Sequence, residues 1–125
     1  MKKIIHTLKA PQAIGPYSQA VEVNGMLFVS GQIGVDPETG DFVPGGIREQ
    51  TLRVLKNIEI ILMSAGYTRN DVVKSTVYLK DLNDFKEMNE AYASFYEERH
   101  PARAAIQVAR LPMDALVEIE TIAVR

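Results

Sequence analysis

The clearest pattern of apolar and polar positions runs from Ile47 to Ala65 and predicts an amphipathic helix. Apolar residues recur there every three or four positions, and the charged residues fall largely on the opposite side. The expected apolar stripe consists of Ile47, Val54, Ile58, Ile61 and Ala65, widened by Leu55 and Leu62. Gly66 comes next, where a helix often ends in the left-handed conformation that glycine adopts easily.

A second helix is predicted to start at Asp84, which resembles an N-cap residue with an acidic residue, Glu87, three positions later. Pro101 follows the end of this helix. The apolar stripe consists of Phe85, Met88, Tyr92 and Phe95. We interpret the aromatic positions as core and expect Asn89, which lies off the stripe, to be solvated.

Strands are expected wherever β-branched residues cluster or apolar residues alternate with polar ones. The expected strands are Ile4 to Leu8, Ala20 to Val23, Met26 to Ser30, Val72 to Leu79, Ala104 to Ala109 and Leu116 to Val124. Asn24-Gly25 joins two of them and is the strongest short hairpin signal. The resulting order is β-β-β-α-β-α-β-β, an α/β chain of the α+β type. Its two helices can cover only one face of a mixed sheet.

The last strand has an unusual second face. Val117, Ile119, Thr121 and Ala123 alternate with a second set, namely Leu116, Glu118, Glu120, Ile122 and Val124. This second set is apolar at both ends and acidic in the middle, which is unusual for a solvated surface. We therefore expect another copy of the chain to cover this face, and predict an obligate oligomer.

Composition narrows the possible functions. The chain has 125 residues, 46% hydrophobic and 24% charged, with a net charge of −2, which is typical of a single globular domain spanning residues 1–125. The charges are mixed, so nucleic-acid binding is not expected. There is no cysteine, and His6 and His100 lie far apart, so we expect no metal site. No stretch resembles a signal peptide or a membrane span, which favours a cytoplasmic protein without membrane contact.

Candidate chemistry lies mainly in the last fifth of the chain. An arginine such as Arg103 can bind a small carboxylate through two parallel hydrogen bonds. A partly dehydrated glutamate, Glu118 or Glu120, can take a proton from water. Because Arg103 stands at the entry of one expected strand and the glutamates lie on the next, they suggest a site that hydrates a small carboxylated molecule. Each of these residues is also common on a solvated surface, and alternation does not separate Glu118 from Glu120 because both point the same way.

Two glycine-containing segments are further candidates. Ser30-Gly31-Gln32-Ile33-Gly34 ends a buried strand, and its glycines permit the backbone to approach a ligand or another chain. The stiff segment Ile14-Gly15-Pro16-Tyr17-Ser18 presents a tyrosine, although such a side chain often only packs. Ser30 has no histidine close in sequence, so a serine-nucleophile triad has no support.

Five segments together resemble one family. They are Ile14-Gly-Pro-Tyr17-Ser-Gln-Ala, Ser30-Gly-Gln-Ile-Gly34, Val72-Val-Lys-Ser-Thr-Val-Tyr-Leu-Lys-Asp-Leu-Asn-Asp-Phe85, Pro101-Ala-Arg103-Ala-Ala and Val117-Glu-Ile-Glu-Thr-Ile-Ala123. The order and spacing of these five segments resemble those of the RidA (YjgF-type) enamine/imine deaminases. The resemblance implies a chorismate-mutase-like subunit in a homotrimer with a central barrel and sites between subunits. It also implies hydrolysis of short 2-imino acids such as 2-iminobutanoate and 2-iminopropanoate, released by pyridoxal-phosphate dehydratases, to 2-oxo acids and ammonia without a cofactor.

The resemblance also implies roles for individual residues. Arg103 matches the arginine that binds the substrate carboxylate, and Glu118, rather than Glu120, matches the glutamate that orients or activates water. The matching residues of the cleft are Tyr17, Ser30, Gly31, Phe85 and Asn89. Many relatives have cysteine where this chain has Ala105, so only backbone contacts with substrate are expected at that position.

Other functions remain open at this point. A regulator that binds 2-oxo acids would use the same cleft, and the sequence does not separate it from an enzyme. A ribonuclease or translation inhibitor, an activity ascribed to some relatives, is disfavoured by the acidic balance and the two isolated histidines. A chorismate mutase activity is suggested only by analogy with the expected fold, which is weak evidence for function.

Overall fold

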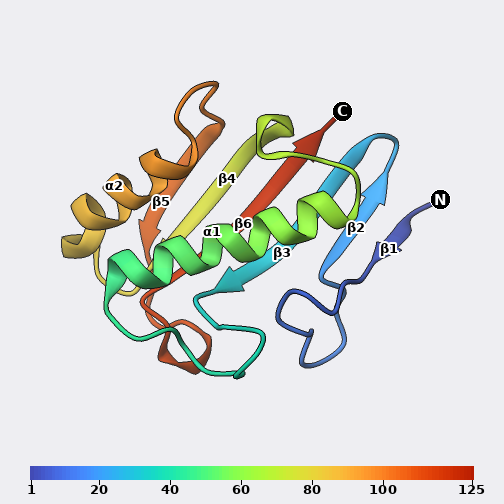
Figure 1. Cartoon of the computed structure of the whole chain (residues 1–125). Helices are drawn as coiled ribbons and strands as arrows, with labels where there is room; N and C mark the ends of the chain where they lie inside the picture. The colour runs from blue at the N-terminus through green and yellow to red at the C-terminus, as the bar shows by residue number, and fades with distance from the viewer.

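The computed structural model describes all 125 residues and has one six-stranded mixed sheet with both helices on a single face (Figure 1). The elements are β1 (Lys3–Ile5), β2 (Ala20–Val23), β3 (Met26–Ile33), α1 (Ile47–Ser64), β4 (Val72–Leu79), α2 (Phe85–Phe95), β5 (Ala102–Gln107) and β6 (Val117–Val124). The strand order is β1-β2-β3-β6-β4-β5, and only β4 and β5 run parallel. The predicted element order and α+β class are confirmed.

Strand ends differ from the prediction where pairing across the sheet overrides local sequence. The first strand ends at Ile5, and β3 continues through Gly31 to Ile33. The fifth strand starts at Ala102 instead of Ala104, so Arg103 lies within the strand, where it pairs with Ser75 of β4. Arg103 is therefore fixed by the pairing of β5 with β4.

The turns confirm one prediction and correct another. Asn24 and Gly25 both have positive φ, 50° and 77°, as expected for the hairpin turn. Asp84 is the N-cap position of α2, as predicted, but its side chain makes no capping hydrogen bond. A 3₁₀ turn over Leu82–Asp84 precedes α2, and the Asp81 carboxylate accepts the Asn83 N–H at 2.8 Å instead. The chain is already helical before α2, so the capping hydrogen bond lies upstream.

The core lies between the helices and one face of the sheet, and the opposite face has no covering layer. Along β6, Val117, Ile119 and Ala123 are fully buried under the helices. Glu118 and Ile122, which point the other way, are only half-buried. The predicted alternation is thus confirmed, and it leaves an apolar and acidic sheet face open in the single chain.

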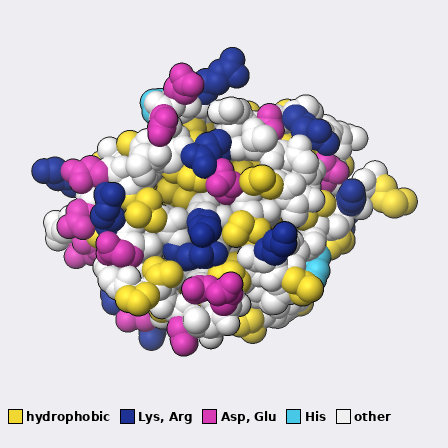
Figure 2. Space-filling model, viewed as in Figure 1, with side chains coloured by type: hydrophobic (Ala, Val, Ile, Leu, Met, Phe, Trp, Pro, Cys, Tyr) yellow, Lys and Arg dark blue, Asp and Glu magenta, His cyan; other side chains and the backbone are white.

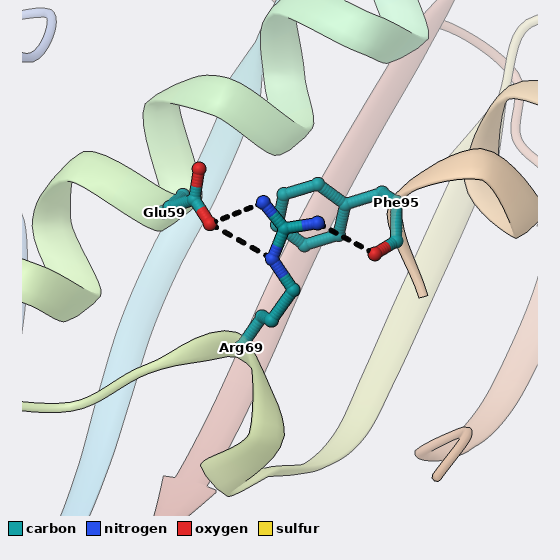
Figure 3. Close-up of polar contacts among 3 residues, drawn as sticks. All are labelled: Glu59, Arg69 and Phe95. Atoms are coloured by element: carbon teal, nitrogen blue, oxygen red, sulfur yellow. Dashed lines mark hydrogen bonds and ion pairs between the residues drawn. The ribbon is translucent and has the colours of Figure 1, made fainter. Parts of the chain in front are cut away.

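Arg69 connects the two helices to the loop before β4 (Figure 3). Its Nε donates to Glu59 Oε2 of α1 at 2.9 Å, and its Nη1 donates to the Phe95 carbonyl of α2 at 2.8 Å. The guanidinium also lies 4.0 Å from the centre of the Phe95 ring. Because the last carbonyls of a helix lack partners within the helix, Arg69 caps α2 and fixes it against α1.

We expect Arg69→Met to lower the free energy of unfolding by about 1–2 kcal/mol, measured by urea denaturation. The substitution removes the partners of the Phe95 carbonyl and of Glu59. The expected loss is small because the Arg69 and Glu59 side chains are 39% and 28% exposed, so water screens their ion pair. Lys86→Met, at an exposed position of α2, is the control. Equal stability of the two variants would contradict the role given to Arg69.

Candidate active site

A cleft of about 850 Å³ opens beside β3 and β6, on the side of the loop that contains residues 11–19. Four of the predicted site residues line it, namely Tyr17, Ser30, Gly31 and Glu118. Its wall also includes Ile14, from the candidate segment around Tyr17, and three residues that the sequence did not mark, namely Gln12, Pro112 and Met113. These three come from two loops far apart in sequence, and no local motif marks them.

Glu118 lies directly against the backbone of Gly31. A Cβ atom added at Gly31 would be 2.5 Å from Glu118 Oε2 and 2.9 Å from its Cδ. The register between β3 and β6 shifts between Val29 and Gln32, so the strand is irregular where Gly31 meets the carboxylate. Only glycine at position 31 leaves room for the Glu118 side chain in this position. The sequence predicted that the backbone at Gly31 approaches another group closely, and that group is the Glu118 carboxylate.

The electrostatics separate the two glutamates that alternation left equivalent. Burial raises the pKa of the Glu118 carboxyl, and the neighbouring Glu120 charge raises it further. Glu120 is exposed and accepts a hydrogen bond of 2.6 Å from the Tyr78 hydroxyl. That bond, with burial, raises the pKa of Tyr78 to about 12. Glu118 is thus the better proton acceptor, while Glu120 already has a partner.

Ser30 and a buried glutamine fix the loop that carries Tyr17. The Ser30 hydroxyl donates to the Ser18 carbonyl at 2.6 Å, so it supports the loop. Gln19, only 2% exposed, accepts the Thr7 N–H at 2.7 Å and donates to the Pro11 carbonyl at 2.9 Å. Tyr17 is itself 52% exposed. The loop is therefore held in place while its tyrosine remains available to a ligand.

Arg103 lies against α2, on the helix-covered face. Its Nη1 donates to Asn89 Oδ1 at 2.7 Å, and its guanidinium carbon is 5.5 Å from the centre of the Phe85 ring. The same carbon is 4.8 Å from the ring centre of Tyr92, which the apolar stripe of the second helix predicted to be a core residue. The spacing of Phe85, Asn89 and Tyr92 along one face of a helix is the signal that would have found this contact.

The predicted site residues therefore form two groups on opposite faces of the sheet. Arg103 contacts α2 on one face, whereas Glu118 alternates with buried residues and points to the uncovered face. Strand β4 also lies between β5 and β6. The expectation that two successive strands bring Arg103 to Glu118 is wrong for a single chain, because β5 and β6 follow one another in sequence but are not neighbours in the sheet. Ala105, half-buried on β5, packs against the core.

We expect Gly31→Ala to reduce kcat/KM for any reaction that uses Glu118 by at least about tenfold. The added methyl group would displace the carboxylate, and a misplaced catalytic group typically costs much more rate than stability. Because the atom in the way is the end of a flexible side chain, the melting temperature should change little. Gly46→Ala, at a position outside the cleft with negative φ and no atom within 4 Å of an added Cβ, tests for general effects of replacing a glycine. Full activity in Gly31→Ala would show that Glu118 has no fixed role.

Other kinds of site find little support in the structure. No group of three His, Cys, Asp or Glu side chains is close enough to hold a metal ion. None of the helices has both the length and the apolar character of a membrane span. On the face shown in Figure 2, basic and acidic side chains are interspersed and form no continuous basic stripe.

Residues 7–125 match the family model described as endoribonuclease L-PSP. A RutC family protein of Pyrococcus horikoshii is 57% identical over 123 residues, which cover 98% of each chain. The 2-iminobutanoate/2-iminopropanoate deaminase of Mus musculus is 53% identical over 125 residues, which cover 100% of this chain and 93% of the mouse protein.

Solved structures share the whole fold. E. coli TdcF with bound serine is 48% identical and superimposes with a TM-score of 0.94 over 98% of each chain. A Rid family protein of Yersinia pestis is 46% identical, with a TM-score of 0.97 over 100% of each chain. Because the family model described as endoribonuclease L-PSP matches nearly the whole chain, residues 7–125, the chain belongs to the RidA (YjgF) family.

Proposed function

We propose that this protein hydrolyses short 2-imino acids, such as 2-iminobutanoate and 2-iminopropanoate, to 2-oxo acids and ammonia. The observation that carries the proposal is Glu118, a carboxylate with a raised pKa in a cleft large enough for a small acid. Arg103 supplies a supported guanidinium for the substrate carboxylate. Mammalian relatives about 50% identical to this chain are named for this reaction.

The proposed mechanism assigns Arg103 to binding and Glu118 to proton transfer. Arg103 holds the substrate carboxylate with two parallel hydrogen bonds, which places the imine carbon beside Glu118. Glu118 takes a proton from water as the water oxygen attacks this carbon, and then returns the proton to nitrogen. In the resulting carbinolamine, the hydroxyl proton passes through Glu118 to nitrogen, the carbonyl of the 2-oxo acid forms, the carbon–nitrogen bond breaks and ammonia leaves. General-base assistance of this kind gives ~10²–10⁴-fold, which suits an imine that already hydrolyses readily in water.

The site is complete only if Arg103 and Glu118 come from different copies of the chain. A single chain places them on opposite sheet faces, and the apolar part of the open face needs a cover. We propose the homotrimer that the family resemblance implies, with the open faces around a central barrel and one site at each subunit boundary. Sedimentation equilibrium of the purified protein tests the trimer directly.

Mixing two inactive variants tests the shared site. Equal amounts of Arg103→Ala and Glu118→Gln subunits are reassembled into mixed trimers. At each boundary, one subunit supplies an intact Arg103 in half of the cases, and its neighbour supplies an intact Glu118 in half of the cases. Roughly a quarter of the sites would then be intact, and activity should return to about that level. No recovery from properly mixed trimers would place both residues in the same subunit's site.

The reaction itself is tested by a coupled assay. An amino-acid oxidase generates the imino acid, and semicarbazide traps what remains, so the rate of semicarbazone formation reports imine disappearance. Faster disappearance with the wild type, lost in Arg103→Ala, supports the deaminase. Tight binding of 2-oxobutanoate without any acceleration would instead indicate a 2-oxo-acid regulator that uses the same cleft.

The description of the family model raises endoribonuclease as a second candidate. The net charge of −2 and the interspersed charges give little attraction for an RNA backbone. Cleavage of a labelled RNA by the wild type, retained in both Arg103→Ala and Glu118→Gln, would favour this activity over the proposed one.

A further inference from the structure

We propose that Tyr92 is a positioning residue for Arg103, whose guanidinium its ring face holds in the orientation that receives the substrate carboxylate. The inference rests on the proposed function and deepens it. It extends the carboxylate site from the strand that carries Arg103 to a side chain of α2 that is otherwise part of the core.

The geometry around Arg103 favours a support built from one helix face. The guanidinium carbon lies 4.8 Å from the Tyr92 ring centre, within the range of about 6 Å for a cation–π contact. Asn89 accepts one of its N–H groups at 2.7 Å, and Phe85 lies farther away, at 5.5 Å. Of the five N–H donors of the guanidinium, this arrangement uses one and leaves four for a ligand.

Tyr92 is the rigid part of this support. It is only 4% exposed, whereas Phe85 is 36% exposed and freer to move. The Tyr96 ring packs against Tyr92 with 4.9 Å between the ring centres, which fixes the plane of the Tyr92 ring. Burial raises the pKa of the Tyr92 hydroxyl, so the ring stays neutral and presents the electron-rich face that attracts a cation.

The ring of Tyr92, and not its hydroxyl, meets the guanidinium. The hydroxyl is buried and makes no hydrogen bond to Arg103 or Asn89. An exposed arginine without support would sample many rotamers, and the substrate would have to select one of them. A ring that fixes the guanidinium beforehand reduces this cost of binding.

Three variants separate positioning from simple packing. Tyr92→Phe keeps the ring, Tyr92→Leu keeps an apolar side chain without a ring face, and Met88→Ala disturbs another fully buried position of the same helix. Calorimetry with 2-oxobutanoate gives Kd, and the imine assay gives KM and kcat. We expect Tyr92→Leu to raise Kd and KM about 3- to 30-fold with little change in kcat, and Tyr92→Phe to stay within about twofold of wild type.

Two results would overturn the inference. One is a wild-type Kd in Tyr92→Leu while Arg103→Ala abolishes binding. The other is an equal rise of Kd in Tyr92→Leu and Met88→Ala, because both would then act only through the stability of α2. Thermal unfolding of each variant shows whether α2 stays folded under the assay conditions.

A ligand-free measurement keeps this test separate from the proposed function. If the wild type neither binds 2-oxobutanoate nor hydrolyses an imine, the proposed function fails. The position of Arg103 is then still observable by NMR, because the Tyr92 ring current shifts the Arg103 Nε–H signal, which Arg103→Lys identifies by its loss. A shift kept in Tyr92→Phe and lost in Tyr92→Leu supports the inference. An unchanged signal in Tyr92→Leu overturns it.

Discussion

Arg103→Lys is expected to lower kcat/KM for 2-iminobutanoate by roughly 10- to 100-fold, and Arg103→Ala by more. A lysine keeps the positive charge but replaces the planar fork with a point cation, so only one of the two parallel hydrogen bonds to the substrate carboxylate survives. It also loses the fixed contact of the guanidinium with Asn89. The semicarbazide assay at several substrate concentrations measures the effect.

Two features make this result easy to interpret. Arg103 is exposed at the edge of the sheet, so its replacement should leave the melting temperature nearly unchanged. Arg110→Lys, at an exposed position in the loop that follows β5, is the matched control and should keep full activity. Near-native kinetics of Arg103→Lys would mean that the carboxylate is not held by a fork, and the binding role would have to move to another residue.

Glu118→Gln is expected to reduce kcat by about 10²–10⁴-fold with little change in KM, because the amide cannot take a proton from water. Glu120→Gln, with the same change in charge and shape two residues away, should reduce kcat much less. Glu120 already accepts a hydrogen bond from Tyr78 and is exposed, whereas Glu118 is half-buried against Gly31. Single-turnover kinetics with both variants tests this ranking, and the reverse ranking would assign the base to Glu120.

The pH profile provides an independent check on the same residue. A base must be unprotonated to act, so activity falls as the pH drops through the pKa of Glu118. Because burial and Glu120 both raise that pKa, the fall should begin above the range of an ordinary glutamate. Removing the Glu120 charge in Glu120→Gln should move the fall to lower pH. A shift to higher pH would show that Glu120 does not act on Glu118 through its charge.

The elements of the fold could be predicted because each depends on residues close together in the sequence. The apolar stripe between Ile47 and Ala65 and the left-handed residues of the Asn24-Gly25 turn express local backbone and side-chain preferences. The alternation along β6 also predicted correctly which residues the helices bury. Local preference failed at Asp84 and at the start of β5, where the preceding turn and the pairing with β4 decide.

The arrangement of the site was beyond local patterns. The sequence by itself determined which residue types are available, and the family resemblance singled out Arg103 and Glu118. Only the tertiary structure decided that β4 lies between their strands, that they occupy opposite faces, and that Gly31 and Tyr92 are their neighbours. The physical reason is that strand order and long-range contacts follow from burying the whole core at once, which a short stretch of sequence does not encode.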